Sequence, residues 1–208
     1  VAVLVLAKCL MDLSILLSAH IAVAPVWLAI WAVVPLAIWL EDRGPIFYRQ
    51  RRLGLNGRPF NVLKFRTMIP NAEKHTGAIW ATKDDPRITR VGRILRRTAL
   101  DELPQVINIA RGDMSFVGPR SERPELHAEF TKSVPGFERR LAVLPGLTGL
   151  AQVKGDYNLP PAEKVAYDIY YIQHWSLWLD VTLIVASIGK TFSMGWDRKQ
   201  GERKAKRA

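Results

Sequence analysis

The chain has 208 residues, 49% hydrophobic and 24% charged, enough for one compact domain with a membrane segment but crowded for two domains. Its net charge of +11 favours anionic partners: nucleic acid, acidic lipid head groups or phosphorylated small molecules. A single cysteine, Cys9, excludes an intrachain disulfide framework and fits a reduced, cytoplasmic setting. The four histidines show no zinc-ligand spacing, and no dinucleotide-binding glycine fingerprint or Walker loop is present.

The first predicted element is an apolar segment, residues 13–40, without a formally charged side chain. As one straight helix it would be about 42 Å long, more than the roughly 30 Å of a hydrocarbon core. Pro25 lies near its middle and favours a sharp bend. The arms 13–24 and 26–40 would each be about 18 to 22 Å long, too short to cross alone. A kinked spanning helix and a re-entrant hairpin both remain open.

The charges on either side of the apolar segment bear on its topology. Lys8 and Asp12 precede it, and a hairpin would keep them on the same face as the rest of the chain. The residues that follow it are rich in arginine, which places the downstream domain on the cytoplasmic side: Arg43, Arg49, Arg51, Arg52 and Arg58.

A β-hairpin is predicted next, with strands at 46–49 and 60–65 joined by a turn at 55–58 that contains Asn56-Gly57. Lys64 and Arg66 flank Phe65, so in a strand they would project to one face as a paired cationic site. A solvated basic edge is the alternative.

Two helices are predicted between residues 88 and 110. The first is marked by arginines at helical spacing, and the second, from Glu102 to about Ala110, has an apolar stripe. Asp101 then suits the N-cap of the second helix. The adjacent carboxylates Asp101 and Glu102 lie among many arginines, however, and an acidic nucleophile in a basic phosphate pocket is chemically sensible.

The remaining elements are short until the C-terminal region. A strand is predicted at 114–117, followed by a loop from which Arg120 could reach back towards Asp101, and a turn is predicted at 145–150. Residues 175–196 suit an interfacial helix with tryptophans at head-group depth, or a buried core helix. Residues 198–208 form a basic tail that would favour anionic lipid.

At 100–120 the sequence LDELPQVINIARGDMSFVGPR resembles the bacterial sugar transferase family, the monotopic phosphoglycosyl transferases that begin exopolysaccharide and related glycan synthesis. The segments KFRTM at 64–68, PGLTGLAQV at 145–153 and YDIYY at 167–171 are similar to the same family. The resemblance covers essentially the whole chain. It departs at two positions: Ala24-Pro25 stands where the family has Ser-Pro, and Ser121 where it usually has Pro.

The resemblance implies a covalent mechanism. Asp101 would attack the β-phosphorus of a UDP-sugar and release UMP, and polyprenyl (undecaprenyl) phosphate would then take the sugar phosphate. Glu102 would bind magnesium or assist proton transfer, so that Asp101 and Glu102 are the expected Mg²⁺ ligands. Lys64, Arg96 and Arg120 match the family's cationic positions and would bind phosphates. The family also implies that the apolar segment dips into one leaflet and returns, with the bend at Pro25.

We therefore expect a mostly helical α+β protein on the cytoplasmic face of a bacterial inner membrane, with a short β-hairpin, an N-terminal re-entrant membrane helix and interfacial amphipathic helices. Its predicted parts are a membrane-embedded segment 1–40, a catalytic domain 41–197 and a basic tail 198–208. The expected partners are a UDP-sugar, polyprenyl phosphate and membrane lipid, without nucleic acid. The alternative functions are a membrane-tethered nucleic-acid binder, for which no reader motif is found, and an adaptor, which leaves Asp101 and Glu102 unexplained. The sequence does not identify the sugar, and 156–158 is the expected specificity region.

Overall fold

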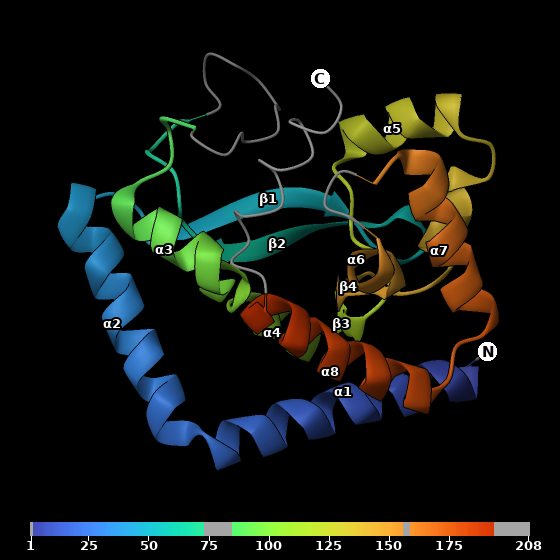
Figure 1. Ribbon diagram of the computed structural model, residues 1–208, viewed down its shortest axis with the longest axis horizontal. Helices are drawn as coiled ribbons and strands as arrows, with labels where there is room; N and C mark the ends of the chain where they lie inside the picture. Colours follow the sequence, from blue (N-terminus) through green and yellow to red (C-terminus); the bar gives the residue numbers. More distant parts are fainter. Residues whose placement is uncertain (1, 73–84, 156–158, 194–208) are drawn as a thin grey trace.

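The computed structural model describes residues 2–72, 85–155 and 159–193. The fold is mostly helical, with one antiparallel β-hairpin and one parallel pair of strands among these residues (Figure 1). The predicted mostly helical α+β class with a short hairpin is confirmed. The expected specificity region 156–158, residues 194–196 of the predicted last helix and the tail 198–208 lie outside the described residues.

The apolar N-terminal segment forms two helices, α1 (Ala2–Ala22) and α2 (Ala24–Asp42), set at a wide angle (Figure 1). The backbone departs from helical dihedral angles at Val23, which has φ −121° and ψ 28°. The bend thus lies two residues before the predicted position, because Pro25 falls in the first turn of α2, where a missing amide proton costs nothing. Pro35, by contrast, lies inside α2, which continues through it.

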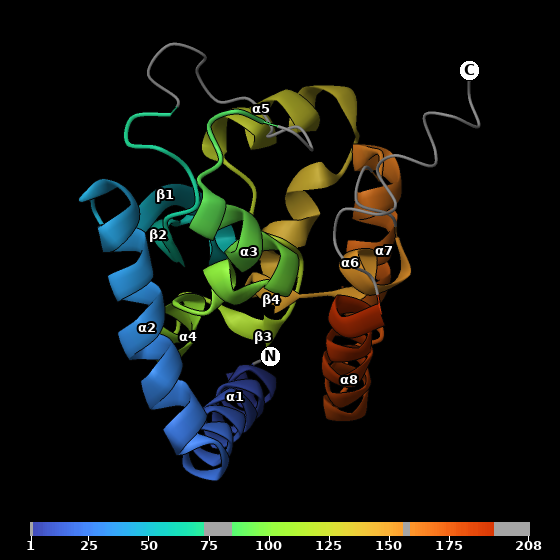
Figure 2. The ribbon, with the colours of Figure 1, turned by 60° about the vertical axis from the view of Figure 1, so that its left-hand side comes forward.

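Both outer ends of this helix pair are attached to the rest of the protein. In α1, Lys8 is 8% exposed and forms an ion pair with Asp180, while Asp12 accepts a hydrogen bond from the Phe116 amide at 3.3 Å. At the end of α2, Asp42 forms an ion pair with the buried Arg66. The bend between them projects away from the body in two views (Figures 1 and 2).

By length and composition α2 could cross a membrane, since its most apolar window has a mean hydropathy of 1.7 and is only 11% buried. Many large apolar side chains of both helices face outward, among them Leu17, Ile21, Leu28, Val33 and Leu36. This exposed apolar surface is unusual for a protein that meets only water. The predicted boundary between the membrane-embedded segment 1–40 and the catalytic domain 41–197 stays a prediction.

The predicted hairpin is confirmed, with longer strands than expected. Strand β1 (Phe47–Leu53) pairs antiparallel with β2 (Pro59–Phe65), from Phe47 opposite Phe65 to Leu53 opposite Pro59. The connection is a short 3-10 turn, η1 (Leu55–Gly57), in which Asn56 (φ 54°) and Gly57 (φ 75°) take left-handed conformations. Asparagine and glycine adopt such dihedrals at little cost, which explains the turn.

A parallel pair of strands replaces the turn predicted at 145–150. Strand β3 (Ser115–Val117) was predicted, but β4 (Gly146–Thr148) was not. The two backbones approach so closely that a side-chain carbon on Gly146 would lie 2.1 Å from the Gly118 amide nitrogen. Glycine is therefore required for this pairing. The predicted turn is wrong, because the small residues allow two strands to approach closely instead of reversing the chain.

The other helices surround these strands. The predicted arginine-rich helix is α3 (Arg90–Thr98), and the predicted helix from Glu102 divides into η2 (Leu100–Glu102) and α4 (Gln105–Ala110). The remaining elements are α5 (Pro124–Ser133), η3 (Phe137–Ala142), α6 (Leu150–Lys154), α7 (Pro161–Gln173) and α8 (Leu177–Ser193).

Helix α8 packs against the rest of the protein with one face and exposes the opposite face. Leu183 and Asp180 are buried, whereas Trp178 is 79% exposed and Val185 and Ile188 are also exposed. Trp175, just before the helix, donates from its indole nitrogen to Asp180 at 2.9 Å. The described part of α8 is therefore amphipathic, as expected of an interfacial helix.

A hydrophobic cluster joins the apolar helix α2 to the middle of the chain. Val34 and Ile38 of α2 pack with Phe65 of β2 and Leu95 of α3. Leu100 and Leu103, which flank Asp101 and Glu102 in the sequence, pack against this cluster. The carboxylate pair is thus held in place by the same core that holds α2.

Candidate active site

Asp101 and Glu102 lie in the single turn η2, between α3 and α4. The residue before this turn, Ala99, has φ 56°, a left-handed conformation that costs a non-glycine residue about 1 kcal/mol or more. The N-cap interpretation of Asp101 is wrong, because Pro104 occupies that position of α4 and no side chain caps the helix. The carboxylates are therefore presented by a tight turn.

Two cations from distant parts of the chain meet at Glu102. Lys64, near the end of β2, donates from Nζ to Glu102 Oε1 at 2.6 Å. Arg120, three residues after β3, donates from Nη2 to the same oxygen at 3.0 Å. The structure thus brings together Lys64, Arg120 and the carboxylate pair, as the sequence predicted.

The pKa values of the two carboxyl groups are shifted in opposite directions. Burial and the adjacent Glu102 raise the pKa of Asp101 to about 6, against the smaller opposing effects of Lys64, Arg96 and Arg120. Burial also disfavours the ionised form of Glu102, but Lys64 and Arg120 outweigh it and hold the pKa of Glu102 far below its usual range. None of the ion pairs in the described part of the chain involves Asp101. Asp101 is thus an ionisable carboxylate beside one that is held ionised by two cations.

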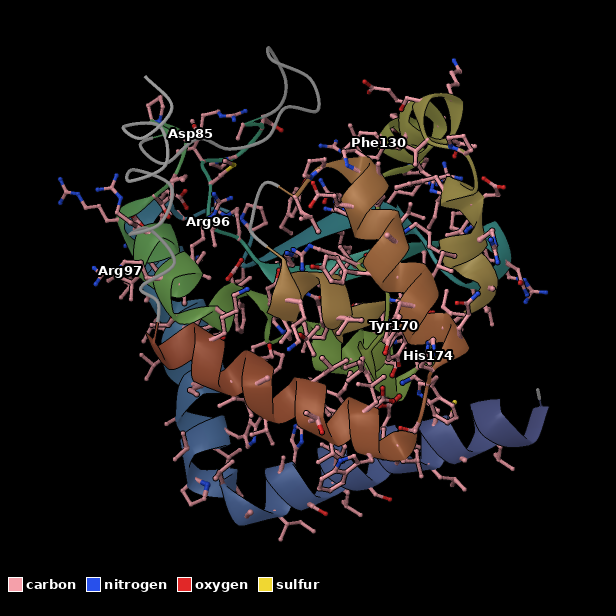
Figure 3. All side chains as sticks on the ribbon, turned by 45° about the vertical axis from the view of Figure 1, so that its right-hand side comes forward. Asp85, Arg96, Arg97, Phe130, Tyr170 and His174 are labelled. Carbon is pink, nitrogen blue, oxygen red and sulfur yellow. The ribbon has the colours of Figure 1, made fainter. Side chains whose placement is uncertain are left out.

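Arg96 completes the positive surroundings without touching the pair. It lies on α3 and donates from Nε to Thr67 Oγ1 at 3.0 Å. Figure 3 shows it directed towards the body, whereas its neighbour Arg97 points outward. Arg96 still lowers the pKa of Asp101, so it lies close enough to act on an anion there.

The expected pairing of Lys64 with Arg66 is wrong. Arg66 is 6% exposed, and Asp42 accepts hydrogen bonds from both Nη atoms of its guanidinium, one of them at 2.8 Å. Lys64 binds Glu102 instead. The strand ends at Phe65, so the alternation assumed for the two residues does not continue to Arg66.

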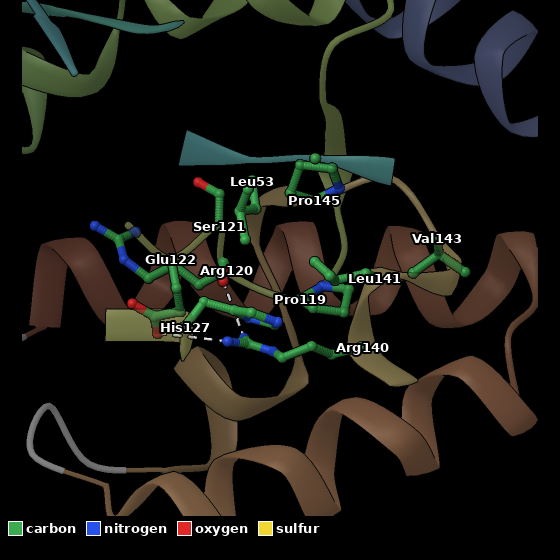
Figure 4. A pocket seen from close by; sticks show the side chains of 11 residues that line it. Leu53, Pro119, Arg120, Ser121, Glu122, His127, Arg140, Leu141, Val143 and Pro145 are labelled. Carbon is green, nitrogen blue, oxygen red and sulfur yellow. Dashed lines mark hydrogen bonds and ion pairs between the residues drawn. The ribbon is translucent and has the colours of Figure 1, made fainter. Parts of the chain in front are cut away.

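A buried ionic network behind Arg120 was missed by the sequence reasoning. Arg140 of η3 donates to Asp168 of α7 at 2.7 Å and to the backbone carbonyl of Arg120 at 2.9 Å. It also contacts Glu122 at 3.5 Å, and Lys164 donates to Glu122 at 2.9 Å. Figure 4 shows Arg140 beside a pocket lined by this loop. Nothing in the local sequence around Arg140 indicates these long-range contacts.

The backbone of the loop that carries Arg120 forms hydrogen bonds with β4 and with the side chain of Arg52. Gly118 donates to the Thr148 carbonyl at 2.9 Å, and Pro119 accepts from the Gly146 amide at 3.0 Å. Arg52 donates to the Ser121 carbonyl at 2.7 Å. These bonds restrain the loop around Ser121.

The end of the apolar helix α2 also caps α3. The carboxylate of Glu41 accepts hydrogen bonds from the amides of Arg90 (2.7 Å) and Val91 (3.1 Å), and Thr89 Oγ1 accepts from Gly92 (2.9 Å). All three amides of the first turn are satisfied, two of them by a residue from another helix. Glu41 thereby fixes α3, which leads directly into the turn with Asp101.

We expect the substitution Glu41→Ala to destabilise the protein by about 1 kcal/mol, because two helix amides and the helix dipole lose their carboxylate. Thermal denaturation in detergent should show a decrease of about 2 to 4 °C. Glu129→Ala, at an exposed position of α5, is the matched control. Equal melting temperatures for the two variants would contradict this role.

The described residues contain no group of three or more histidine, cysteine, aspartate or glutamate side chains placed to hold a metal. Asp101 and Glu102 nevertheless offer two adjacent carboxylates, and both cations bind the same oxygen, Oε1, of Glu102. Magnesium is commonly held by one or two carboxylates together with substrate phosphates and water. The donor set therefore fits Mg²⁺ only when a phosphate ligand completes it.

The fold and this site define a protein with a buried carboxylate pair among cationic side chains, next to an exposed apolar helix pair. The family model described as bacterial sugar transferase matches residues 3–194, and the chain belongs to this family. It is 41% identical over 186 residues to a UDP-glucose:undecaprenyl-phosphate glucose-1-phosphate transferase of Xanthomonas campestris pv. campestris, covering 87% of this chain and 38% of the relative.

Two further relatives differ from the first in the sugar that their names give or in length. A UDP-N-acetylgalactosamine-undecaprenyl-phosphate N-acetylgalactosaminephosphotransferase of Aeromonas hydrophila is 39% identical over 176 residues, 83% of this chain and 41% of the relative. An exopolysaccharide production protein of Sinorhizobium fredii is 40% identical over 191 residues, 85% of this chain and 81% of the relative. The chain thus spans about two fifths of the length of the first two relatives.

Proposed function

We propose that this chain transfers a sugar phosphate from a UDP-sugar to polyprenyl (undecaprenyl) phosphate and releases UMP, as the first step of exopolysaccharide or a related glycan synthesis. The observation that carries the proposal is the unequal pair: Glu102 is ion-paired to Lys64 and Arg120, while Asp101 makes no ion pair with the described residues. With a pKa of about 6, Asp101 is mostly ionised at neutral pH and has oxygen lone pairs available for attack.

In the first step a carboxylate oxygen of Asp101 attacks the β-phosphorus of the UDP-sugar. An oxygen–phosphorus bond forms, and the bond between the β-phosphorus and the bridging oxygen breaks, so that UMP leaves with the electron pair. The product on the enzyme is an acyl phosphate that still carries the sugar. Lys64, Arg96 and Arg120 supply positive charge for the phosphates, which is the main requirement of phosphoryl transfer.

In the second step a phosphate oxygen of the polyprenyl phosphate attacks the same phosphorus. The bond between phosphorus and Asp101 breaks, which restores the carboxylate and yields a polyprenyl diphosphate sugar. When bound at Asp101 and Glu102, Mg²⁺ would neutralise phosphate charge. Arg120 is held by its loop and Glu102 by two cations, so these groups need little rearrangement between the two steps.

The lipid acceptor requires the site to lie at a membrane surface, and the exposed apolar faces of α1, α2 and α8 support this. Because Lys8 at the start of α1 and Asp42 at the end of α2 both bind the body, the helix pair would enter one leaflet and return. The arginines after α2 favour a body on the cytoplasmic face of the inner membrane, and we include this orientation in the proposal. No comparison favours the alternative nucleic-acid-binding or adaptor function.

The proposal is tested with donors labelled with ³²P in the β-phosphate, including UDP-glucose and UDP-N-acetylgalactosamine, added to the detergent-solubilised chain with magnesium. One donor should release UMP and label the protein, and polyprenyl phosphate should remove the label into a lipid product. Release of UDP, or lipid product without labelled protein at any time, would contradict the covalent mechanism. Failure of folded protein to turn over any donor would return the adaptor function to consideration.

A further inference from the structure

Strand β4 and the helix after it, α6, contain buried polar side-chain atoms without hydrogen-bond partners. Both amide atoms of Gln152, Oε1 and Nε2, are enclosed, and no described residue bonds to either. The hydroxyl of Thr148, a residue that is 8% exposed, is in the same state. Native proteins satisfy the large majority of such groups, because each unpaired one costs about 1 to 3 kcal/mol. These side chains therefore require a partner that the described chain does not supply.

The unpaired atoms lie close to the loop that carries Arg120. Val117 of β3 and Thr148 of β4 are paired in register, so the residues that follow the two strands emerge at the same edge. A side-chain carbon on Gly149 would be 2.2 Å from the Gly118 carbonyl oxygen and 2.8 Å from Gln152 Oε1. Gln152 is thus adjacent to the start of the loop whose guanidinium binds Glu102.

The backbone around Gln152 is fixed. Lys190 of α8 donates from Nζ to the carbonyl oxygens of Gln152 (2.7 Å), Val153 (3.1 Å) and Gly155 (2.9 Å). The residue as a whole is only half-buried, so part of it lies at the surface of the body beside the enclosed amide atoms. A ligand that pairs with this amide would meet a preorganised helix end.

A primary amide offers a donor and an acceptor side by side in one plane, which suits a neutral partner with the complementary pair. In a UDP-sugar the imide edge of uracil, N3–H next to a carbonyl, has this pattern. The phosphates do not, since they only accept. We propose that Gln152, assisted by the hydroxyl of Thr148, binds the uracil base of the donor; this inference rests on the proposed function.

The proposal predicts opposite effects of Gln152→Leu on stability and binding. Leucine is similar in size and has no unpaired amide, so the melting temperature should stay equal or rise. Isothermal titration of the detergent-solubilised chain with UMP should show binding weakened by about 10-fold, equivalent to two lost hydrogen bonds. Binding of inorganic diphosphate should change by less than about 2-fold, since the phosphate-binding cations are intact.

A ligand modified at the same edge provides the second half of the test. The wild type should bind N3-methyl-UMP about 10-fold more weakly than UMP, whereas Gln152→Leu should bind the two within about 2-fold of each other. Gln173→Leu makes the same exchange at an exposed position of α7 and should leave both affinities unchanged.

Three outcomes would overturn the assignment to uracil. They are unchanged UMP binding by Gln152→Leu, an equal loss of diphosphate binding, and a loss confined to the intact UDP-sugar, which would place the amide on the sugar. If the wild type neither binds UMP nor releases it from any UDP-sugar, the proposed function itself fails. UMP release by the wild type together with any of the three outcomes leaves that function standing and removes only this inference.

Discussion

Asp101→Asn is expected to abolish UMP release and protein labelling and, at the same time, to stabilise the fold above pH 6. The amide cannot form the acyl phosphate, so the loss of activity should be at least about 1,000-fold. The gain in stability follows from the raised pKa of Asp101, because burial and the charge of Glu102 make the ionised carboxylate unfavourable in the folded chain.

The pH dependence of this gain has a definite sign. The pKa of Asp101 is about 6 in the folded chain and near 3.8 when unfolded, so the folded wild type binds a proton more tightly. This contribution to wild-type stability is fully present below pH 4 and is lost as the pH rises through 6. The asparagine variant does not titrate at this position, so its advantage should be negligible at pH 4 and reach on the order of 3 kcal/mol at pH 8.

The measurement is a set of melting temperatures from pH 4 to 8 for wild type and variant, with an expected difference of about 7 °C at pH 8. Glu129→Gln, which also replaces a carboxyl group by an amide, lies at an exposed position of α5 and is the matched control. A stability difference that does not grow with pH would show that Asp101 is not held in an unfavourable ionised state. Activity of the wild type should decline as the pH falls below 6.

Arg140→Met is expected to cause the largest loss of stability, about 3 to 5 kcal/mol. The substitution leaves Asp168, which is 1% exposed, and the buried Glu122 without their shared guanidinium. The backbone carbonyl of Arg120 also loses its hydrogen bond from Arg140, so Arg120 should be less well placed. Activity should therefore decrease even at temperatures where the variant remains folded.

Thermal and urea denaturation should show a melting temperature lowered by about 10 °C. Arg139→Met replaces the exposed neighbour in η3 and should have little effect. In the double variant Arg140→Met with Asp168→Asn, removal of the unpaired charge should recover part of the stability. Purely additive losses in the double variant would contradict the ionic coupling of Arg140 and Asp168.

Local patterns in the sequence were sufficient for many elements of the fold. Asn56-Gly57 predicted the hairpin, the arginine spacing predicted α3, and residues 114–117 predicted β3, because each signal acts within a few residues. The carboxylate pair and its cations were selected by the resemblance at 100–120, and the structure brings Lys64 and Arg120 to Glu102. The role of Asp101 as a nucleophile stays a proposal.

Composition, turn residues and long motifs are properties of neighbouring residues, so they were enough to predict the bent apolar segment, the hairpin, the basic character and the family of this protein. The pairing of charges over long separations could be known only from the folded chain. Lys8 forms an ion pair with Asp180, and Arg66 forms one with Asp42 instead of lying beside Lys64. Arg140 donates a hydrogen bond to the loop that carries Arg120. A buried charge takes whichever opposite charge the packing places beside it, and the packing of the whole chain, here the core shared by α2 and the Asp101 turn, sets that choice.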